Sequence, residues 1–400
     1  MNFKNTDVLI LAGGRGSRIK TITDKIPKPL IKFNKKPLLD FILQHISKYN
    51  FNKIFILTGY KSNKIFNRYH DKFYNFIKIN CFHEKKRLGT WGAIFNVKNK
   101  IKKNFIVVNG DTIFDSELEK LLKFKLKKEH MVMFISKKHS YKENKKLKNI
   151  KVNNKNNIIF DKRSKYINSG QYYLSKKILK KKYSKLRSLE NEIIPELINQ
   201  KKIKGIIENK KIIDIGTKRN LIYANKNIPK ITLKPAVFLD RDGVINYDFG
   251  HVYKFKDFKF KPGIIKILKY LSKKNIYIFI VTNQSGIAKG MYSEKDFYIL
   301  HKKIKDYLVN KKIFINDVQF SPYHPEAIIK KYKKKSSLRK PGNLMIEKLF
   351  SKWNVIRKKS FMIGDSLTDE LAAKKSKLYF EFPKKDIYTQ IKKICDQLKI

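Results

Sequence analysis

Cysteine is nearly absent from this chain: Cys81 and Cys395 are the two among 400 residues. Two cysteines are too few for a disulfide framework, and these two lack metal-ligand spacing, so we expect a reducing compartment. No apolar stretch reaches the roughly 18 to 20 residues that a membrane-spanning helix requires. The amino terminus also lacks a charged segment that leads into a long apolar core. We therefore expect a soluble, cytoplasmic protein without a membrane partner.

Acidic residues are also scarce, with 33 Asp and Glu against 92 Lys and Arg and a formal net charge of +59. Such an excess normally indicates a nucleic-acid or anionic-membrane partner. Here the lysines are spread over both halves beside abundant Asn, Ile, Phe and Tyr, which A/T-rich codons largely encode. We therefore expect no nucleic-acid partner, and the positive field should help to attract phosphorylated substrates. A basic nucleic-acid-binding or scaffold protein with inactive domains is the alternative from another class.

Length and apolar content predict two or three domains, because 400 residues at 42% hydrophobic can bury two ordinary cores. Short apolar runs alternate with helix-period segments, as in DVLILA, PLLDFILQHISKYN and KIFILTG. This alternation is typical of parallel βαβ units. The pattern restarts near Ala236, after a mixed stretch over 218–235 that contains two prolines. The sequence thus predicts an α/β protein with domains at 1–228 and 229–400.

A glycine-rich turn follows the strand predicted over 7–12. Its glycines leave backbone N–H groups open to phosphate oxygens, and Arg15 adds positive charge. The continuation DKIPKPLI places Lys28 in a segment bracketed by prolines. The glycines of the turn are Gly13, Gly14 and Gly16.

Three further motifs in the first half are RLGTWGAI at 87–94, VVNGD at 107–111 and IDIGT at 213–217. Together with the glycine-rich turn they resemble the sugar-1-phosphate nucleotidyltransferase family over nearly all of residues 5–225. The resemblance implies a Rossmann-like, GT-A-like fold in which Asp111 and Asp214 hold Mg²⁺. It also implies that Arg15 stabilises the leaving pyrophosphate, that Lys28 binds the phosphates in transfer, and that the turn at Gly13 and Gly14 binds substrate.

The segments INSGQYYL at 167–174 and SLENEIIP at 188–195 match the family's sugar-recognition regions. The resemblance implies that Asn168, Gly170 and Glu190 contact sugar hydroxyls, although Glu190 could instead cap or pair with a helix. Gly89 and Thr90 should lie near the base or ribose, at the start of a helix predicted over 90–101. The combination of motifs looks most like the heptose 1-phosphate guanylyltransferase branch.

The second half contains FLDRDGV, which places Asp240 and Asp242 two residues apart just after a predicted strand. One carboxylate in such a pair can attack phosphorus while the other moves the proton of the leaving group. The pieces VTNQSG at 281–286, RKP at 339–341 and GDSLTDE at 364–370 follow in order. This order is similar to that of the haloacid dehalogenase (HAD) phosphatase superfamily, which implies a HAD-like Rossmannoid domain.

By that resemblance, Asp240 forms the aspartyl-phosphate and Asp242 is the acid/base, whose main-chain carbonyl also binds the metal. Thr282 and Lys340 hold the phosphoryl group, and Asp365 completes the Mg²⁺ site. Asp369, at a predicted helix start, is either a supporting carboxylate or a helix N-terminal charge.

Residues 236–375 resemble D-glycero-D-manno-heptose 1,7-bisphosphate phosphatases and their histidinol-phosphatase relatives, which implies that Asn283 and Arg339 contact the second phosphate or hydroxyls. Ser366 stands where relatives often have Lys. We expect no structural zinc despite His324, because the positions of the relatives' Cys and His zinc loop hold poor zinc ligands. Those residues are Ser321, Tyr323, Ser336 and Leu338.

The two resemblances describe successive reactions. Heptose 1,7-bisphosphate would lose its C7 phosphate in the second domain. The resulting heptose 1-phosphate would receive GMP from GTP in the first, with Mg²⁺ in both domains. We therefore expect a bifunctional enzyme that makes GDP-D-glycero-α-D-manno-heptose for a surface polysaccharide. Histidinol phosphate has no such link to sugar activation. A transferase for another sugar, such as mannose 1-phosphate, beside a different phosphatase is the nearest alternative, and the oligomeric state stays open.

Overall fold

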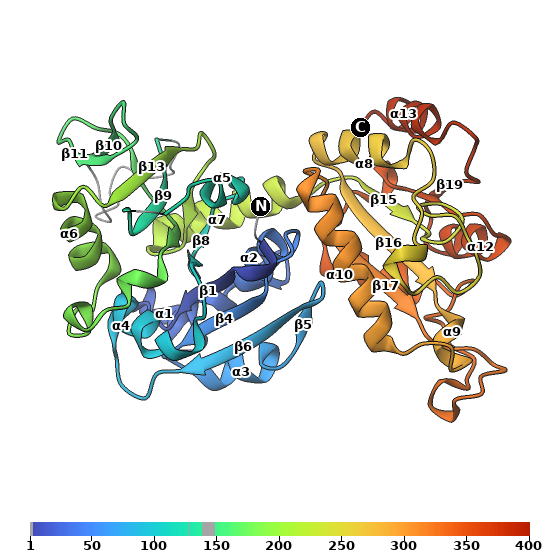
Figure 1. Ribbon diagram of the computed structural model, residues 1–400, viewed down its shortest axis with the longest axis horizontal. Coiled ribbons are helices and arrows are strands. Elements are labelled where there is room, and N and C mark those ends of the chain that lie inside the picture. Colours follow the sequence, from blue (N-terminus) through green and yellow to red (C-terminus); the bar gives the residue numbers. More distant parts are fainter. Residues whose placement is uncertain (1–2, 127, 138–148) are drawn as a thin grey trace. The chain divides into compact units, whose positions relative to one another are not determined.

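The computed structural model describes residues 3–126, 128–137 and 149–400. The chain forms two compact units (Figure 1), Met1–Ser47 with Phe51–Pro229 and Lys48–Asn50 with Lys230–Ile400. The stretch in which we expected the boundary is mostly a helix, α7 (Lys218–Thr232), with Pro229 inside it. Its buried residues include Leu221, Ala224 and Ile228, whose spacing places them on one helical face. Burial of that face explains why the helix continues past Pro229.

An eight-stranded sheet forms the centre of the first unit. Strands β1, β4 and β7 read as nearly continuous apolar runs, which suits strands covered on both faces. β1 pairs in parallel with β4 and with β7. The strands in sheet order are β13 (Ile203–Ile207), β9 (Met131–Ser136), β12 (Ile167–Leu174), β7 (Phe105–Asn109), β1 (Asp7–Ala12), β4 (Lys53–Thr58), β6 (Ile77–His83) and β5 (Phe73–Tyr74).

Parallel pairing, which the sequence predicted, holds for β7, β1, β4 and β6 but not throughout this sheet. β12 runs antiparallel to both of its neighbours, β7 and β9. A parallel connection needs a crossover, usually a helix. The described residues between β9 and β12 contain instead a hairpin of β10 (Ile150–Val152) and β11 (Ile158–Phe160). Two further ladders pair β2 (Lys32–Phe33) with β3 (Lys36–Pro37) and β8 (Thr112–Ile113) with β14 (Ile213–Asp214).

Helices cover the sheet of the first unit. Leu9 of β1 and Val107 of β7 share a buried cluster with Trp91 and Ile94 of α4 and with Leu197 of α6. The helices of this unit, besides α7, are α1 (Lys20–Thr23), α2 (Leu38–Ser47), α3 (Ser62–Tyr69), α4 (Gly89–Asn96), α5 (Glu119–Leu122) and α6 (Ile194–Asn199).

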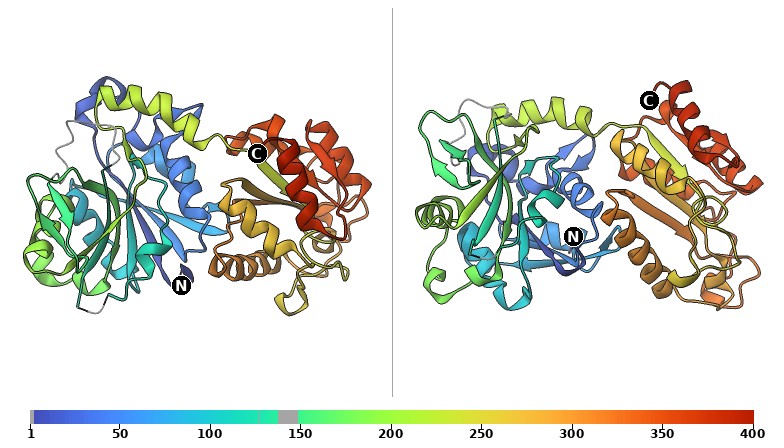
Figure 2. Two further views of the ribbon diagram at one scale, coloured as in Figure 1. Left: turned by 90° about the horizontal axis from the view of Figure 1, so that it is seen from above. Right: turned by 45° about the horizontal axis from the view of Figure 1, so that its top comes forward.

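The second unit is built on a five-stranded sheet whose pairings are all parallel. Successive side chains of a strand point to opposite faces. Val237 of β15 accordingly packs with α8 and α13, whereas Phe238 packs with α11. Figure 2 shows the helices on both faces of this sheet. In sheet order the strands are β17 (Asp317–Ser321), β16 (Tyr277–Asn283), β15 (Ala236–Leu239), β18 (Phe361–Ile363) and β19 (Tyr379–Glu381). The helices are α8 (Ile264–Lys273), α9 (Ser285–Ala288), α10 (Glu294–Asn310), α11 (Leu344–Lys352), α12 (Leu367–Lys375) and α13 (Ile387–Gln397).

The strand order reverses at β15, because β16 and β17 lie to one side of it and β18 and β19 to the other. Ligands of such sheets bind beyond the carboxyl ends of the strands at the reversal. Asp240 directly follows β15, and Asp365 lies two residues after the end of β18. The α/β prediction with a Rossmann-like and a HAD-like unit is confirmed. In the described part of the chain, no helix has both the length and the apolar character required to span a bilayer.

Candidate active sites

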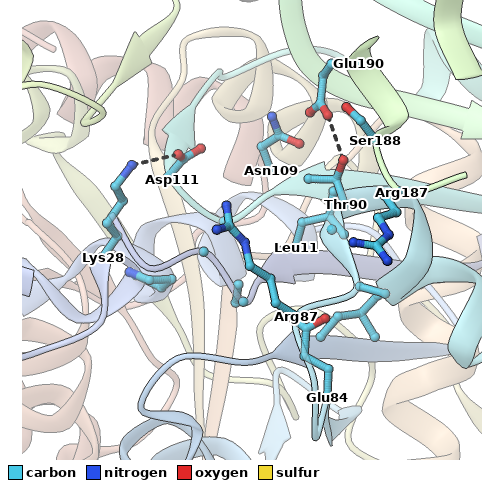
Figure 3. A pocket seen from close by; sticks show the side chains of 18 of the residues that line it. Leu11, Lys28, Glu84, Arg87, Thr90, Asn109, Asp111, Arg187, Ser188 and Glu190 are labelled. Carbon is cyan, nitrogen blue, oxygen red and sulfur yellow. Dashed lines mark hydrogen bonds and ion pairs between the residues drawn. The ribbon is translucent and has the colours of Figure 1, made fainter. Parts of the chain in front are cut away.

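The first unit contains a cavity of about 600 Å³ beyond the ends of β1 and β7 (Figure 3). Gly13 and Gly14 line it directly after β1, and Asp111 lines it two residues after β7. Gly110 donates its N–H to the carbonyl of Leu11 at 2.9 Å, and a Cβ there would lie 2.6 Å from that oxygen. The glycine of the NGD motif therefore permits the close approach that holds Asp111 beside the glycine-rich turn.

Lys28 reaches this cavity from a 3₁₀ turn, Lys28–Leu30, and its side chain is buried. Its Nζ lies 3.5 Å from Asp111 Oδ2, as Figure 3 shows. Gly16 has a φ of +71°, and a Cβ on it would lie 2.8 Å from Lys28 Cε. The glycine-rich turn thus leaves the room through which the lysine enters the cavity.

Asp111 and Asp214 come from neighbouring positions of a two-stranded ladder. Asp214 pairs with Thr112, and the N–H of Ile215 donates to the carbonyl of Asp111 at 3.1 Å. Asp214 is buried, and its Oδ1 accepts hydrogen bonds from the N–H of Gly216 at 2.7 Å and from Asn220 at 2.8 Å. Carboxylate oxygens on adjacent strands, with substrate phosphates, are the ligands that Mg²⁺ prefers. Asp111 lines the cavity and Asp214 is absent from its lining, so the metal role of this pair stays a prediction.

Glu190 lines the cavity from a π-helical turn, Leu189–Ile193. Its Oε2 accepts a hydrogen bond from the Thr90 hydroxyl at 2.8 Å, and that hydroxyl accepts one from the Leu189 N–H at 2.8 Å. The position of Glu190 is therefore compatible with both roles considered for it, because it faces the cavity and also pairs with the start of α4.

α4 is shorter than the helix predicted over 90–101. It ends at Asn96, and Val97 begins a separate 3₁₀ turn, Lys98–Lys100. Asn and Val have low helix propensity, which explains the break. At the other end, Gly89 has a φ of +80°, and a Cβ on it would overlap the carbonyl of Arg187. This glycine thus allows α4 to dock against the segment that carries Glu190.

Arg15 and Asn168 are absent from the residues that line the cavity. Arg15 is exposed and lies 5.8 Å from the centre of the Tyr60 ring. Asn168 donates to the Tyr172 hydroxyl at 2.5 Å and accepts from the Gly170 N–H at 2.9 Å. Its amide is thus used within β12, and its position does not support the sugar contact that the sequence led us to expect.

Several residues that line the cavity had no assigned role in the sequence. The Glu84 carboxylate accepts a hydrogen bond from the Leu88 N–H at 3.1 Å. Burial raises the pKa of Glu84, although that hydrogen bond lowers it in part. Arg87, Asn109 and Ser188 belong to motifs that the sequence displayed, whereas Glu84 lies three residues before RLGTWGAI and gave no signal. The unassigned residues labelled in Figure 3 are Leu11, Glu84, Arg87, Asn109, Arg187 and Ser188.

The second unit has a cavity of about 310 Å³ at the strand-order reversal. Arg339 is absent from its lining; burial lowers the pKa of this guanidinium. Asn283 lines the cavity, but its amide is engaged: Oδ1 accepts from the Lys340 N–H at 3.0 Å, and Nδ2 donates to the Lys340 carbonyl at 3.1 Å. Asn283 therefore fixes the RKP loop. The other predicted residues that line this cavity are Asp240, Asp242, Thr282, Lys340 and Asp365.

Lys340 is the cation of this site, and its side chain is 2% exposed. Its Nζ lies 2.9 Å from Asp240 Oδ2, pairs with Asp369, and donates to the Val281 carbonyl at 3.1 Å. Burial lowers the pKa of Lys340, but the two carboxylates outweigh it and leave the pKa raised. Burial raises the pKa of Asp240, and Lys340 opposes that rise.

Asp240, Asp365 and Asp369 place carboxylate oxygens within 4.8 Å of one another. Burial raises the pKa of Asp365, the Asp369 carboxylate adds to that rise, and Lys340 opposes it. A hard divalent cation suits such an oxygen-donor set. Gly243 is required beside it, because it has a φ of +76° and a Cβ would overlap the Asp365 carboxylate.

The composition of this cluster differs from the predicted one. Asp369 belongs to it and also caps α12, since its Oδ2 accepts from the Ser366 N–H at 3.2 Å. Asp369 therefore fulfils both alternatives that the sequence left open, and Ser366 has a capping role. The Asp242 carboxylate, for which the resemblance implied an acid/base role and no metal contact, is bound by Arg241 through two nitrogens at 2.8–3.1 Å.

The loop in which the sequence resemblance would place zinc carries no comparable group in the described part of the chain. His324 Nδ1 accepts a hydrogen bond from the Glu326 N–H at 3.1 Å. The expectation that this loop lacks zinc stays a prediction.

The fold and the two cavities define a two-unit α/β enzyme of phosphate chemistry. One unit joins a glycine-rich turn to a lysine and two aspartates, as phosphate transfer from a nucleotide requires. The other joins a pair of aspartates to a buried lysine and a metal-fitting cluster, as a phosphatase with a carboxylate nucleophile requires.

Comparison with known proteins agrees with this class. The nucleotidyl transferase family model matches residues 7–231, and the polynucleotide kinase 3 phosphatase model matches residues 239–389. The D-glycero-beta-D-manno-heptose-1,7-bisphosphate 7-phosphatase of Rhodopseudomonas palustris is 40% identical over 167 residues, which cover 42% of this chain and 93% of that protein. The enzyme of that name from Escherichia coli K12 is 34% identical over 139 residues, 35% of this chain and 73% of that protein. A solved structure, that of HddC from Yersinia pseudotuberculosis complexed with GMP-PN, has 27% sequence identity to this chain and a TM-score of 0.47. The match covers 56% of this chain and 99% of the HddC chain.

The chain therefore belongs to the nucleotidyl transferase family, and its second unit belongs to the family of the heptose bisphosphate 7-phosphatases. The predicted enzyme class, a nucleotidyltransferase joined to a HAD-type phosphatase, is confirmed.

Proposed function

We propose that this chain converts a D-glycero-D-manno-heptose 1,7-bisphosphate into a nucleotide-activated heptose in two steps, with GTP as the nucleotide donor. The observation that carries the proposal is the presence, in one chain, of a nucleotidyl transferase unit and a unit 40% identical to a heptose bisphosphate 7-phosphatase. Removal of the C7 phosphate leaves the anomeric phosphate, which is the group that a nucleotidyl transferase activates.

In the phosphatase unit, Asp240 attacks the phosphorus of the C7 phosphate, and the bond from that phosphorus to the sugar oxygen breaks. The electron pair stays on that oxygen, which takes a proton from the carboxyl of Asp242. Water then attacks the phosphorus of the aspartyl-phosphate and gives a proton back to Asp242. This hydrolysis releases phosphate and restores the Asp240 carboxylate. Lys340 and Thr282 line the cavity where the phosphoryl group is held.

Asp240, Asp365 and Asp369, with the main-chain carbonyl of Asp242, would hold Mg²⁺ in this unit. The ion supplies positive charge that lets a carboxylate approach a phosphate dianion. The raised pKa values of buried Asp240 and of Asp365, which is exposed at the rim of the cluster, support this assignment.

In the transferase unit, an oxygen of the sugar 1-phosphate attacks the α-phosphorus of the nucleotide, and the bond to the β-phosphate breaks with release of pyrophosphate. Lys28 and the backbone of Gly13 and Gly14 line the cavity that would hold these phosphates. Asp111 and Asp214 would hold Mg²⁺ here. Arg15 is exposed beside the cavity, so a contact with pyrophosphate would require its side chain to turn inward.

The position of Glu84 supports guanine as the base of the nucleotide donor. A carboxylate is an acceptor at both oxygens. Guanine presents two neighbouring donors, N1–H and the N2 amino group, whereas adenine presents its amino group beside an acceptor. Glu84 is half-buried in the wall of the cavity next to Gly13, where such a pair of hydrogen bonds would be well shielded from water.

The test is incubation of the protein and Mg²⁺ with the α- or the β-heptose 1,7-bisphosphate and each of GTP, ATP, CTP and UTP, followed by mass spectrometry. The expected product is a GDP-heptose. Heptose 1-phosphate without any nucleotide sugar would contradict the transferase half, and no phosphate release from either anomer would contradict the substrate.

Variants separate the two sites. Asp240→Asn should abolish phosphate release and leave nucleotidyl transfer to supplied heptose 1-phosphate intact, whereas Asp111→Asn should stop pyrophosphate release alone. Loss of both activities in either folded variant would refute the two-site assignment.

A further inference from the structure

Gln284 is a buried residue of the second cavity to which neither the motifs nor the proposed mechanism assigns a role. It directly follows β16, within VTNQSG. Its Nε2 donates to Asp242 Oδ2 at 3.0 Å and lies 2.8 Å from the hydroxyl oxygen of Thr282. One amide group therefore joins the proposed acid/base to a residue that holds the phosphoryl group.

The orientation of this amide follows from the chemistry of its neighbours. A carboxylate oxygen only accepts, so the NH₂ end of Gln284 must face Asp242. The Oε1 end then faces the Tyr292 hydroxyl at 2.6 Å, which must donate. Burial raises the pKa of Tyr292 to about 12, although nearby Arg241 opposes the rise, so the hydroxyl keeps its proton at neutral pH.

Tyr292 is itself held in place from two sides. Its ring stacks on Tyr253, with centres 5.1 Å apart and planes inclined by 7°. On the other side lies Gly286 of VTNQSG, where a Cβ would overlap the Tyr292 ring. The relay from Tyr292 through Gln284 to Asp242 is therefore anchored at its outer end.

Other donors bind Asp242 as well. Arg241 forms a two-nitrogen contact with its carboxylate and donates to the Val252 carbonyl at 2.8 Å, and Asn246 donates to Oδ1 at 2.9 Å. Arg241 binds both carboxylate oxygens, and Gln284 adds a donor to Oδ2 from the side of Thr282. Loss of the Gln284 amide would leave Arg241 and Asn246 to orient the carboxylate, and its link to Thr282 would be lost.

We propose that Gln284, oriented by Tyr292, is a positioning residue that directs the Asp242 carboxyl toward the leaving-group oxygen. This role rests on the phosphatase mechanism proposed above. It acts on the proton that Asp242 delivers when the phosphorus–oxygen bond breaks, so its importance should depend on how much the leaving group needs that proton.

The test compares Gln284→Leu with the wild type on 4-nitrophenyl phosphate and phenyl phosphate, two substrates of nearly equal shape. Nitrophenolate is a stable anion near neutral pH and leaves without a proton, whereas phenolate gains more from protonation. The kcat/KM value reports the steps up to the departure of the leaving group. Because general acid catalysis contributes about 10²–10⁴-fold, we expect kcat/KM to fall about 10- to 100-fold on phenyl phosphate and less than about 3-fold on 4-nitrophenyl phosphate.

Tyr292→Phe is the conservative second variant, since it removes the hydroxyl and keeps the stacked ring. It should shift the ratio of the two kcat/KM values in the same direction by a smaller factor. Gln390→Leu is the matched control, because Gln390 is also a buried glutamine of this unit, and it is bonded to Glu381 and to the Phe382 carbonyl. It should leave the ratio at its wild-type value.

Equal losses on both substrates in Gln284→Leu would overturn the proposal, because weaker phosphate binding or partial unfolding would lower both alike. An unchanged ratio in a folded Tyr292→Phe variant would refute the orienting role of the hydroxyl. Failure of the wild type to act on heptose bisphosphate would contradict the substrate only, since the aryl phosphates still test Gln284.

Discussion

Lys340→Met should strongly destabilise the second unit in the absence of a divalent cation. Lys340 is 2% exposed and pairs with both Asp240 and Asp369, of which Asp369 is fully buried. Removal of one partner from a buried ion pair typically costs about 3–5 kcal/mol, because the charge that stays behind has lost its compensation. Methionine fills a similar volume, so this electrostatic loss should dominate.

Mg²⁺ should reduce the deficit, because the cation would take over part of the neutralisation that Lys340 provides. A ligand at about 100 times its dissociation constant stabilises the folded state by about 2.7 kcal/mol. Saturating Mg²⁺ should thus recover roughly half or more of the lost stability in the variant. Phosphatase activity should stay low, since the phosphoryl group has lost its lysine.

The assay is urea unfolding followed by tryptophan fluorescence. The chain has two tryptophans, and Trp353 lies in the second unit, so a Trp91→Phe background makes Trp353 the single reporter of that unit. Lys384→Met is the control: its lysine is 72% exposed and 3.6 Å from Glu381, a pair of a kind worth at most about 1 kcal/mol. Equal midpoints for Lys340→Met and Lys384→Met in EDTA would refute the reasoning.

Three further predictions concern single residues. Gly243→Ala should abolish phosphate release and spare nucleotidyl transfer, because the added Cβ would displace the Asp365 carboxylate. Phosphate release by the variant at ordinary Mg²⁺ concentrations would contradict this prediction. Glu84→Gln should lower kcat/KM for GTP about 10- to 100-fold relative to ATP, since two hydrogen bonds to a base are worth about 1–3 kcal/mol. An equal loss for both nucleotides would count against guanine recognition by Glu84. Burial lowers the pKa of Lys305 from 10.5 to about 7, so the folded unit binds fewer protons than the unfolded chain between these values. The free energy of unfolding should therefore rise with pH over that window in the wild type and rise less in Lys305→Met, as urea titrations at pH 7 and 9 would show.

Much of both sites could be predicted from the sequence because each motif is a strand followed directly by a loop. Asp240 follows β15, and Asp111 follows β7 after one glycine, so parallel pairing alone brings such residues to the edge of a sheet. The antiparallel course of β12 could not be predicted in this way, since INSGQYYL reads as a strand in either direction. Nor could the sequence show that the Asn168 amide forms its hydrogen bonds within β12.

The sequence by itself determined the two α/β units, the order of their motifs and the residues that we expect to perform phosphate chemistry. These features depend on local strand and turn formation, which a short stretch of residues encodes. The tertiary structure alone decided that Asp369 joins the carboxylate cluster, that Arg241 binds the Asp242 carboxylate, and that Gln284, bonded to Tyr292, reaches Asp242. The last contacts join side chains 42 and 8 residues apart along the chain. Their formation depends on how loops of separate strands pack together, which no single motif specifies.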